Sequence, residues 1–177
     1  SLEKNAVPAG GVVIPGLYGG IRLENISYGY GSEKEILHDI SFTFEAGKAY
    51  AVVGTSGSGK STLLNLLLAP GGDYRGNIWF DEVELREIDS RSLYGLISVI
   101  QQQVFVFNAS VKDNITMFRN FPEREVEAAM EHAHLKELLE ERGVSCLCGE
   151  NGRNLSGGEK QRIAIARSLL KKSAVLL

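Results

Sequence analysis

Residues 54–62, Gly-Thr-Ser-Gly-Ser-Gly-Lys-Ser-Thr, constrain the fold of this chain more than any other segment. They match the pattern G-x-x-x-x-G-K-[ST], whose backbone wraps the phosphates of a nucleotide. The pattern needs a strand before it and a helix after it, and residues 49–53 and 63–68 have the composition of a short buried strand and a helix. The glycines let backbone N–H groups converge on a phosphate without clashes between β-carbons. The alternative is a Gly/Ser-rich turn that leads into an ordinary helix.

Two side chains of this segment carry specific chemistry. We expect the Lys60 ammonium to contact the β- and γ-phosphates and the Ser61 hydroxyl to ligate Mg²⁺. The sequence therefore predicts that the chain binds a nucleoside triphosphate. The candidate binding residues are Gly54, Thr55, Ser56, Gly57, Ser58, Gly59, Lys60, Ser61 and Thr62.

Composition excludes several classes of protein. The 177 residues are 44% hydrophobic, enough for one domain with a core. A net charge of −3 gives no large cationic field, so we expect no nucleic-acid partner. Cys146 and Cys148 are too few for a disulfide framework; they are read as reduced thiols, with half of a metal site as the alternative. No apolar run approaches the roughly 18 residues of a membrane span, and no signal peptide is recognisable. We therefore expect a soluble chain in a reducing cytoplasm.

The hydrophobic pattern changes along the chain from strands to helices. Residues 1–20 hold prolines and glycines without periodicity and are predicted to be a linker or arm. Alternation predicts strands, and recurrence every three to four residues predicts helices. The predicted strands are 21–28, 40–45, 49–53, a hairpin of 77–80 and 83–85, 96–100 and 174–177; the predicted later helices are 122–142 and 158–172.

A second motif, Leu155-Ser156-Gly157-Gly158-Glu159, precedes the last helix. A serine hydroxyl and two glycines at a helix start form a second candidate anion site, although a serine N-cap alone also explains them. A phosphate loop, a strand that ends in glutamines and LSGG-[QE]-x-QR, in this order, resemble the nucleotide-binding domain of ATP-binding cassette (ABC) transporters of the exporter type. The resemblance covers about residues 21–177.

The resemblance implies an α/β fold: a P-loop NTPase core with a parallel sheet, an antiparallel β subdomain and a helical subdomain. The implied domains are an arm at 1–20 and an ABC ATPase domain at 21–177, with the β subdomain at about 21–44 and the helical subdomain at about 110–155.

The resemblance also implies roles for individual residues. Tyr30 looks like the aromatic that stacks on adenine, with Tyr28 as the alternative. Gln102 looks like the glutamine that contacts Mg²⁺ or the attacking water and senses the transmembrane partner; it is flanked by Gln101 and Gln103, which are the alternatives. We expect the loop around Gln102 to be the hinge of a nucleotide-driven rotation, so nucleotide should change hydrogen exchange across residues 101–107.

Two further segments look like contact points with partners. Residues 149–152 resemble the G-E-x-G loop that touches the coupling helices of the membrane domain, or they are a plain acidic turn. Ser156, Gly157 and Gly158 resemble residues that close over the γ-phosphate of ATP held by another subunit. The implied assembly is a head-to-tail dimer, homomeric or heteromeric, that sandwiches two ATP molecules. A membrane-spanning domain, upstream in the same chain or in a separate subunit, is the other implied partner.

The last strand resembles the Walker B strand, after which the family places an aspartate, a glutamate and a switch histidine. His38, His132 and His134 lie upstream of these places and are predicted to be solvated. We interpret the chain as a fragment of an exporter ATPase at the cytoplasmic face of a membrane, and we expect it to hydrolyse ATP very slowly. The alternatives are a non-hydrolysing dimerisation module and a soluble ABC ATPase of DNA repair, translation or iron–sulfur assembly.

Overall fold

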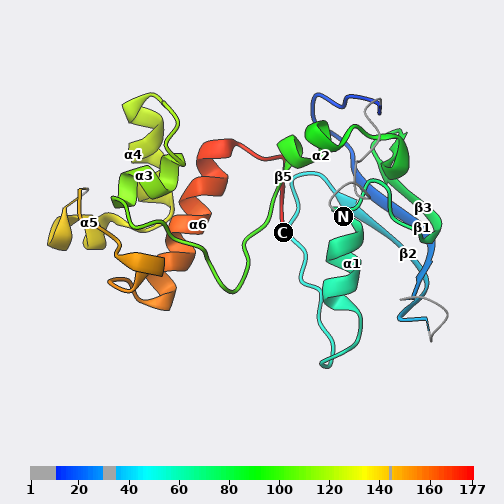
Figure 1. The fold of residues 1–177 in the computed structure, drawn as a ribbon. Helices are drawn as coiled ribbons and strands as arrows, with labels where there is room; N and C mark the ends of the chain where they lie inside the picture. Colours follow the sequence, from blue (N-terminus) through cyan, green and yellow to red (C-terminus); the bar gives the residue numbers. More distant parts are fainter. Residues whose placement is uncertain (1–10, 30–34, 144) are drawn as a thin grey trace, which may run out of the picture. The chain divides into compact units, whose positions relative to one another are not determined.

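The computed structural model describes residues 11–29, 35–143 and 145–177. The chain forms two compact units, which meet in sequence between Ile97 and Ser98. Figure 1 shows a sheet-rich first unit and a helical second unit.

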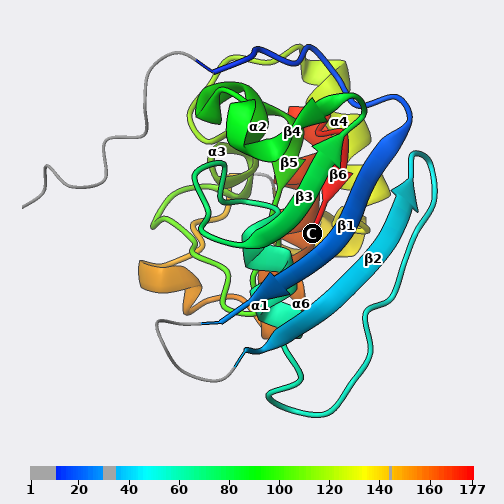
Figure 2. The ribbon, with the colours of Figure 1, turned by 90° about the vertical axis from the view of Figure 1, so that its right-hand side faces the viewer.

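The first unit is built on a four-stranded antiparallel sheet in the order β2-β1-β3-β4 (Figure 2). Its strands are β1 (Gly20–Tyr28), β2 (Leu37–Glu45), β3 (Arg75–Phe80) and β4 (Val83–Glu84). The alternation of apolar and polar residues predicted these strands because one face of the sheet is buried. The side chains of Leu23, Ile26, Ile78 and Phe80 are almost fully buried on that face. The predicted antiparallel pairing of this part of the chain is confirmed.

The predicted strand at residues 49–53 is wrong. None of these residues belongs to a strand, and Val53 is 86% exposed. The segment is attached to β2 by Tyr50, whose ring packs edge-on against Phe42 and Phe44 and whose hydroxyl accepts the Glu45 N–H at 3.0 Å. A strand requires a neighbour that accepts its hydrogen bonds, and the described residues of the first unit provide none for this segment. Apolar composition alone therefore gave the wrong element.

Helices follow the phosphate loop and the sheet. The first unit contains α1 (Lys60–Leu66), η1 (Leu85–Glu87) and α2 (Ser90–Leu96). The sequence did not predict η1 and α2. However, Asp89 is a typical N-cap residue, and its side chain accepts the Ser92 N–H at the start of α2, at 2.9 Å. Asp89 was thus a usable signal for α2.

In the second unit, α3 (Val111–Thr116), α4 (Glu123–His132) and α5 (Lys136–Arg142) precede η2 (Glu150–Gly152) and α6 (Gly157–Lys171). The helix predicted across 122–142 is broken at His134, which has a φ of 53°. Ala133 and Leu135 are both buried, and two residues that are two apart face different sides of a continuous helix. The break lets both side chains enter the core. No helix of the described residues is long and apolar enough to cross a bilayer.

The parallel sheet is represented by one pair of short strands, β5 (Ile97–Ser98) and β6 (Val175–Leu176). The Leu177 N–H donates to the Ser98 carbonyl at 2.8 Å, and the Ile100 N–H donates to the Leu177 carbonyl at 2.7 Å, which is the pattern of parallel pairing. The strand predicted at 96–100 is therefore shorter than expected, because Leu96 ends α2.

Residues 11–20 of the predicted arm lie on the first unit. The Val12 N–H and carbonyl pair with Glu87 and Asp89, at 2.5 and 2.9 Å. The Asp81 carboxylate accepts the N–H groups of residues 18, 19 and 20 at 2.7–2.9 Å. Partial burial acts to raise the pKa of Asp81, but these three backbone bonds outweigh it and lower that pKa. The start of β1 is thus fixed by one charged side chain.

Replacement of Asp81 tests this attachment. We expect Asp81→Asn to lower the free energy of unfolding by roughly 1 kcal/mol at neutral pH, because a charged acceptor of three N–H groups is lost. Since the pKa of Asp81 is lowered in the folded state, the parent should lose this stabilisation as the pH falls from about 5 towards 2. The free energy of unfolding of the variant should not show this part of the pH dependence. The free energy of unfolding at each pH is measured by urea unfolding, followed by the fluorescence of Trp79, the only tryptophan. Glu82→Gln removes the neighbouring exposed acid and should match the parent; equal effects of both changes would contradict the prediction.

Candidate nucleotide-binding site

The phosphate loop ends at Gly59, the N-cap of α1, which has a φ of 88°. Gly57 has a φ of 79°. A β-carbon at Gly59 would lie 2.7 Å from Leu37 Cδ2 and 3.1 Å from Ile36 Cγ2, whereas one at Gly57 would meet nothing within 4 Å. The loop therefore rests directly on the start of β2, and Gly59 is required both by its conformation and by the space available.

Lys60 extends over this loop. Its Nζ donates to the carbonyl oxygens of Gly54 and Thr55, at 2.9 and 2.7 Å, and to Ser58 Oγ at 3.3 Å. All three acceptors are neutral, and an ammonium bonds more strongly to an anionic oxygen. A phosphate that enters the loop would thus compete well for the Lys60 ammonium.

The predicted adenine and glutamine positions have different outcomes. Tyr30 lies outside the described residues, so its role stays a prediction. Tyr28, the alternative, ends β1, and its carbonyl accepts the Ile36 N–H at 2.7 Å. Gln102 lies in an exposed bend of the second unit, and Gln101 and Gln103 are exposed as well. Exposure leaves the Gln102 amide accessible to a ligand and does not distinguish it from its neighbours.

Ser156 is the N-cap of α6 and forms a complete capping box. Its Oγ accepts the Glu159 N–H at 3.3 Å, and the Glu159 carboxylate accepts the Ser156 N–H at 2.5 Å. The spacing S-x-x-E is the sequence signature of this arrangement, so Glu159 was recognisable as the partner of Ser156. Gly157 and Gly158 are exposed, with open space where a β-carbon would lie. Ser156 is therefore an N-cap, as the alternative explanation predicted. The first two residues of α6 are exposed glycines without side chains, so the helix start beside the serine is open to a ligand.

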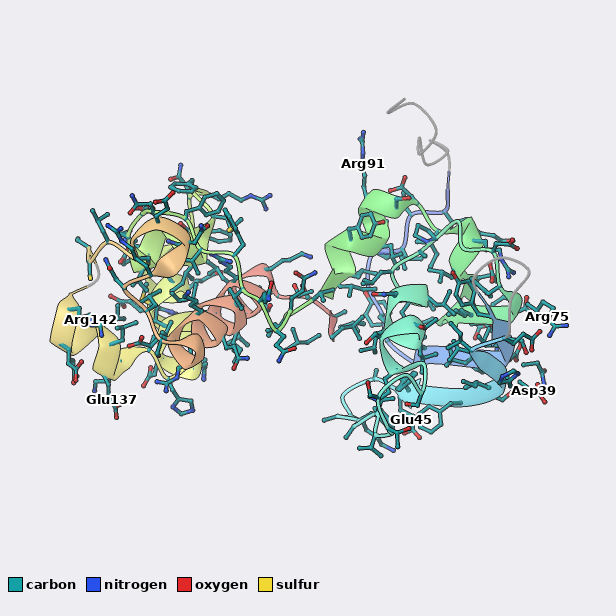
Figure 3. The ribbon with its side chains drawn as sticks, turned by 60° about the horizontal axis from the view of Figure 1, so that its bottom comes forward. Asp39, Glu45, Arg75, Arg91, Glu137 and Arg142 are labelled. Carbon is teal, nitrogen blue, oxygen red and sulfur yellow. The ribbon has the colours of Figure 1, made fainter. Side chains whose placement is uncertain are left out.

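Arg142 supports this helix start from α5, where Figure 3 labels it. Its Nη1 donates to the Asn154 carbonyl at 2.5 Å, and its Nη2 lies 3.8 Å from Glu159 Oε1. Burial acts to raise the pKa of Glu159, but the bonds from Ser156 and the charges of Arg142 and Arg162 lower it. Glu159 therefore stays ionised at neutral pH and keeps the capping box closed.

The two side chains predicted to ligate Mg²⁺ are neutral, and each lies in its own unit. Ser61, exposed in the first turn of α1, offers a hydroxyl oxygen, and the exposed Gln102 offers an amide oxygen. Mg²⁺ takes oxygen ligands, keeps several waters and relies on substrate phosphates, so these donors fit it. Among the described residues, no group of three or more His, Cys, Asp or Glu is placed to hold a metal ion, and Cys146 and Cys148 are free thiols.

The two motifs lie in different units. The first unit carries residues 54–62, and the second carries Gln102 and residues 156–158. The structure brings Gly54, Thr55 and Ser58 together around Lys60. It brings Ser156 together with Glu159 and the two glycines at the start of α6.

Gly57 and Gly59 both have a positive φ, so a pair of alanine variants tests whether the loop packs on β2. We expect Gly57→Ala to cost about 1 kcal/mol of stability, because only backbone strain is introduced. Gly59→Ala should cost at least about twice as much, since the new methyl group also displaces Leu37 and Ile36. Urea unfolding followed by Trp79 fluorescence compares the two, and equal losses would show that the loop does not rest on β2.

The chain resembles known proteins along most of its length. Residues 37–177 match the family described as ABC transporter. An ATP-dependent lipid A-core flippase of Aromatoleum aromaticum is 40% identical over 99% of this chain and 30% of its own length. The mitochondrial iron-sulfur clusters transporter ATM1 of Kluyveromyces lactis is 38% identical over 88% of this chain and 22% of its own length. The chain thus spans less than a third of the length of these relatives.

A solved structure gives the same result for the fold. The structure of a bacterial Atm1-family ABC exporter with ATP bound superposes with a TM-score of 0.84 at 34% identity, over 94% of this chain and 30% of the other. The α/β fold of an ABC ATPase, predicted from the order of the motifs, is confirmed. This chain belongs to the ABC transporter family.

Proposed function

We propose that this chain is an ATP-binding and ATP-hydrolysing domain that drives export across a membrane from its cytoplasmic face. Membership of the family implies ATP binding. The observation that carries the proposal is the Lys60 loop, in which the Lys60 ammonium bonds to two loop carbonyls beside glycines with positive φ. The flippase and the transporter named above support export as the process that the domain serves.

The residues of the loop would act through charge and position. Lys60 would transfer its hydrogen bonds from the loop carbonyls to the β- and γ-phosphates, and backbone N–H groups of the loop would bond to the same oxygens. Ser61 and Gln102 are the residues that would hold Mg²⁺, which would neutralise phosphate charge. Gln102 also orients the attacking water. Tyr30, or Tyr28 in its place, stacks on adenine.

Ser156 combines capping with ligand binding. A hydroxyl offers two acceptor lone pairs and one donor. The Ser156 oxygen accepts the Glu159 N–H, and the Ser156 side chain also bonds to the Glu159 carboxylate. The hydroxyl would turn its proton from the Glu159 carboxylate to a phosphate oxygen, and the exposed Gly157 and Gly158 would let that phosphate approach. We propose that Ser156 closes on ATP in the Lys60 loop of a second domain, in a head-to-tail dimer that ATP stabilises. A membrane-spanning domain is the second partner.

Removal of the ammonium tests ATP binding. We expect Lys60→Ala to weaken Mg·ATP binding at least tenfold, or about 1.4 kcal/mol, because the only side-chain cation of the loop is lost. Isothermal titration calorimetry measures the affinity. The control is Lys48→Ala, which removes an exposed lysine paired with Glu45 and should bind as the parent does. Undiminished binding by Lys60→Ala would contradict the proposal.

A second pair of variants separates capping from dimerisation. Ser156 and Ser110 are both N-caps in the second unit, so each change to alanine should cost about 1 kcal/mol of stability. Only Ser156→Ala should weaken the Mg·ATP-dependent dimer, by on the order of tenfold, because only Ser156 meets a phosphate. Sedimentation velocity with and without Mg·ATP measures the dimer. A parent that stays monomeric at saturating Mg·ATP, or equal loss in both variants, would refute the head-to-tail dimer.

A further inference from the structure

Asn114 of α3 forms a hydrogen-bonded centre in the core of the second unit. Its side chain is fully buried, at 0% exposure, and it bonds to the main chain of Phe107 in both directions. Oδ1 accepts the Phe107 N–H at 2.8 Å, and Nδ2 donates to the Phe107 carbonyl at 3.0 Å. Nδ2 also donates to the Ser110 carbonyl at 3.0 Å. Phe107, five residues beyond Gln102, is therefore held against α3 by the Asn114 side chain.

Arg167 of α6 completes this centre. Its Nε donates to the Asn114 carbonyl at 2.7 Å, and its Nη2 donates to Asn114 Oδ1 at 2.9 Å. Its Nη1 donates to the Phe105 carbonyl at 2.7 Å. One guanidinium thus joins α6, α3 and the segment 105–107, which begins three residues after Gln102. We call this set of bonds the Asn114–Arg167 clamp.

The energetics of the clamp favour a positioning role. Burial lowers the pKa of Arg167, although the guanidinium stays charged at any ordinary pH. Its hydrogen-bond partners within the described residues are neutral carbonyl and amide oxygens, with no carboxylate among them. A half-buried charge without a counter-charge contributes little net stability, because desolvation offsets its hydrogen bonds. What it does provide is fixed geometry, since the planar guanidinium bonds in several directions at once.

The clamp also connects two segments with proposed ligand-binding roles, the start of α6 at Ser156 and the loop that contains Gln102. Ser156 caps the start of α6, and Arg167 lies about 16 Å further along the same helix axis. The helix is continuous between them, so a displacement of its start moves Arg167 and, through it, residues 105–107. We propose that Asn114 and Arg167 are positioning residues that make the Gln102 loop and the Ser156 helix start move as one body, an inference whose nucleotide-dependent part rests on the proposed function.

Arg167→Lys tests the clamp and keeps the charge and the aliphatic stem. The matched control is Arg162→Lys on the same helix, where Arg162 donates to the His134 carbonyl at 3.1 Å and not to residues 105–107. Hydrogen exchange of the full chain without nucleotide is the first measurement. We expect exchange at 105–107 to rise about tenfold or more in Arg167→Lys, with α4 and the melting temperature as in the parent. Arg162→Lys should leave 105–107 at the parental rate. An unchanged rate at 105–107, or an equal rise throughout the second unit, would overturn the proposal.

The same three proteins are then compared with saturating Mg·ATP. Protection of residues 54–62 reports ATP binding and tests the proposed function by itself. In the parent and in Arg162→Lys we expect protection at 101–107 together with the start of α6; in Arg167→Lys the start of α6 should stay protected while 101–107 does not. Protection at 54–62 with identical patterns in all three proteins would overturn the coupling and leave ATP binding intact. If 54–62 gain no protection, the proposed function fails, and the nucleotide-free measurement decides the clamp.

Discussion

Loops of this protein are held by single polar side chains that bond to the main chain. Backbone N–H and C=O groups outside helices and strands must find partners when they leave water, and one well-placed side chain satisfies several of them. Asp81 accepts three N–H groups before β1, and Asn114 bonds to Phe107 in both directions. Ser156 and Glu159 exchange bonds with each other's main chain at the start of α6. The start of α6, where the proposed ligand-binding serine lies, is positioned in this way.

This manner of support explains how short segments keep a defined shape beside mobile ligands. The phosphate loop has a turn bond in its main chain, from the Ser58 N–H to the Thr55 carbonyl, and Lys60 bonds to the carbonyls of Gly54 and Thr55. Gly59 fixes the other end against Leu37. Packing at one end and side-chain bonds at the other thus hold the loop in a defined shape.

The sequence predicted those parts of the fold that depend on local patterns. β1, β2 and the hairpin of β3 and β4 follow from alternation over one buried face, and α6 follows from its cap and periodicity. The strand at 49–53 was wrong because a strand exists only with a neighbour, which composition does not reveal. The break at His134 depends on the burial of Ala133 and Leu135 in the core. The clamp was not predictable either, because Asn114 and Arg167 are 53 residues apart and meet only in the folded unit.

Two cations illustrate how the same kind of bond serves opposite purposes. Lys60 and Arg167 both donate to neutral carbonyl oxygens. Lys60 has a flexible stem and a compact ammonium at an exposed loop, so it can exchange carbonyls for phosphate oxygens at little cost. Arg167 is half-buried, and its three bonds run in fixed directions to two other segments, so an exchange would break its bonds to both of them. The lysine is therefore suited to a ligand that enters and leaves, and the arginine to a geometry that must stay constant while the ligand does so.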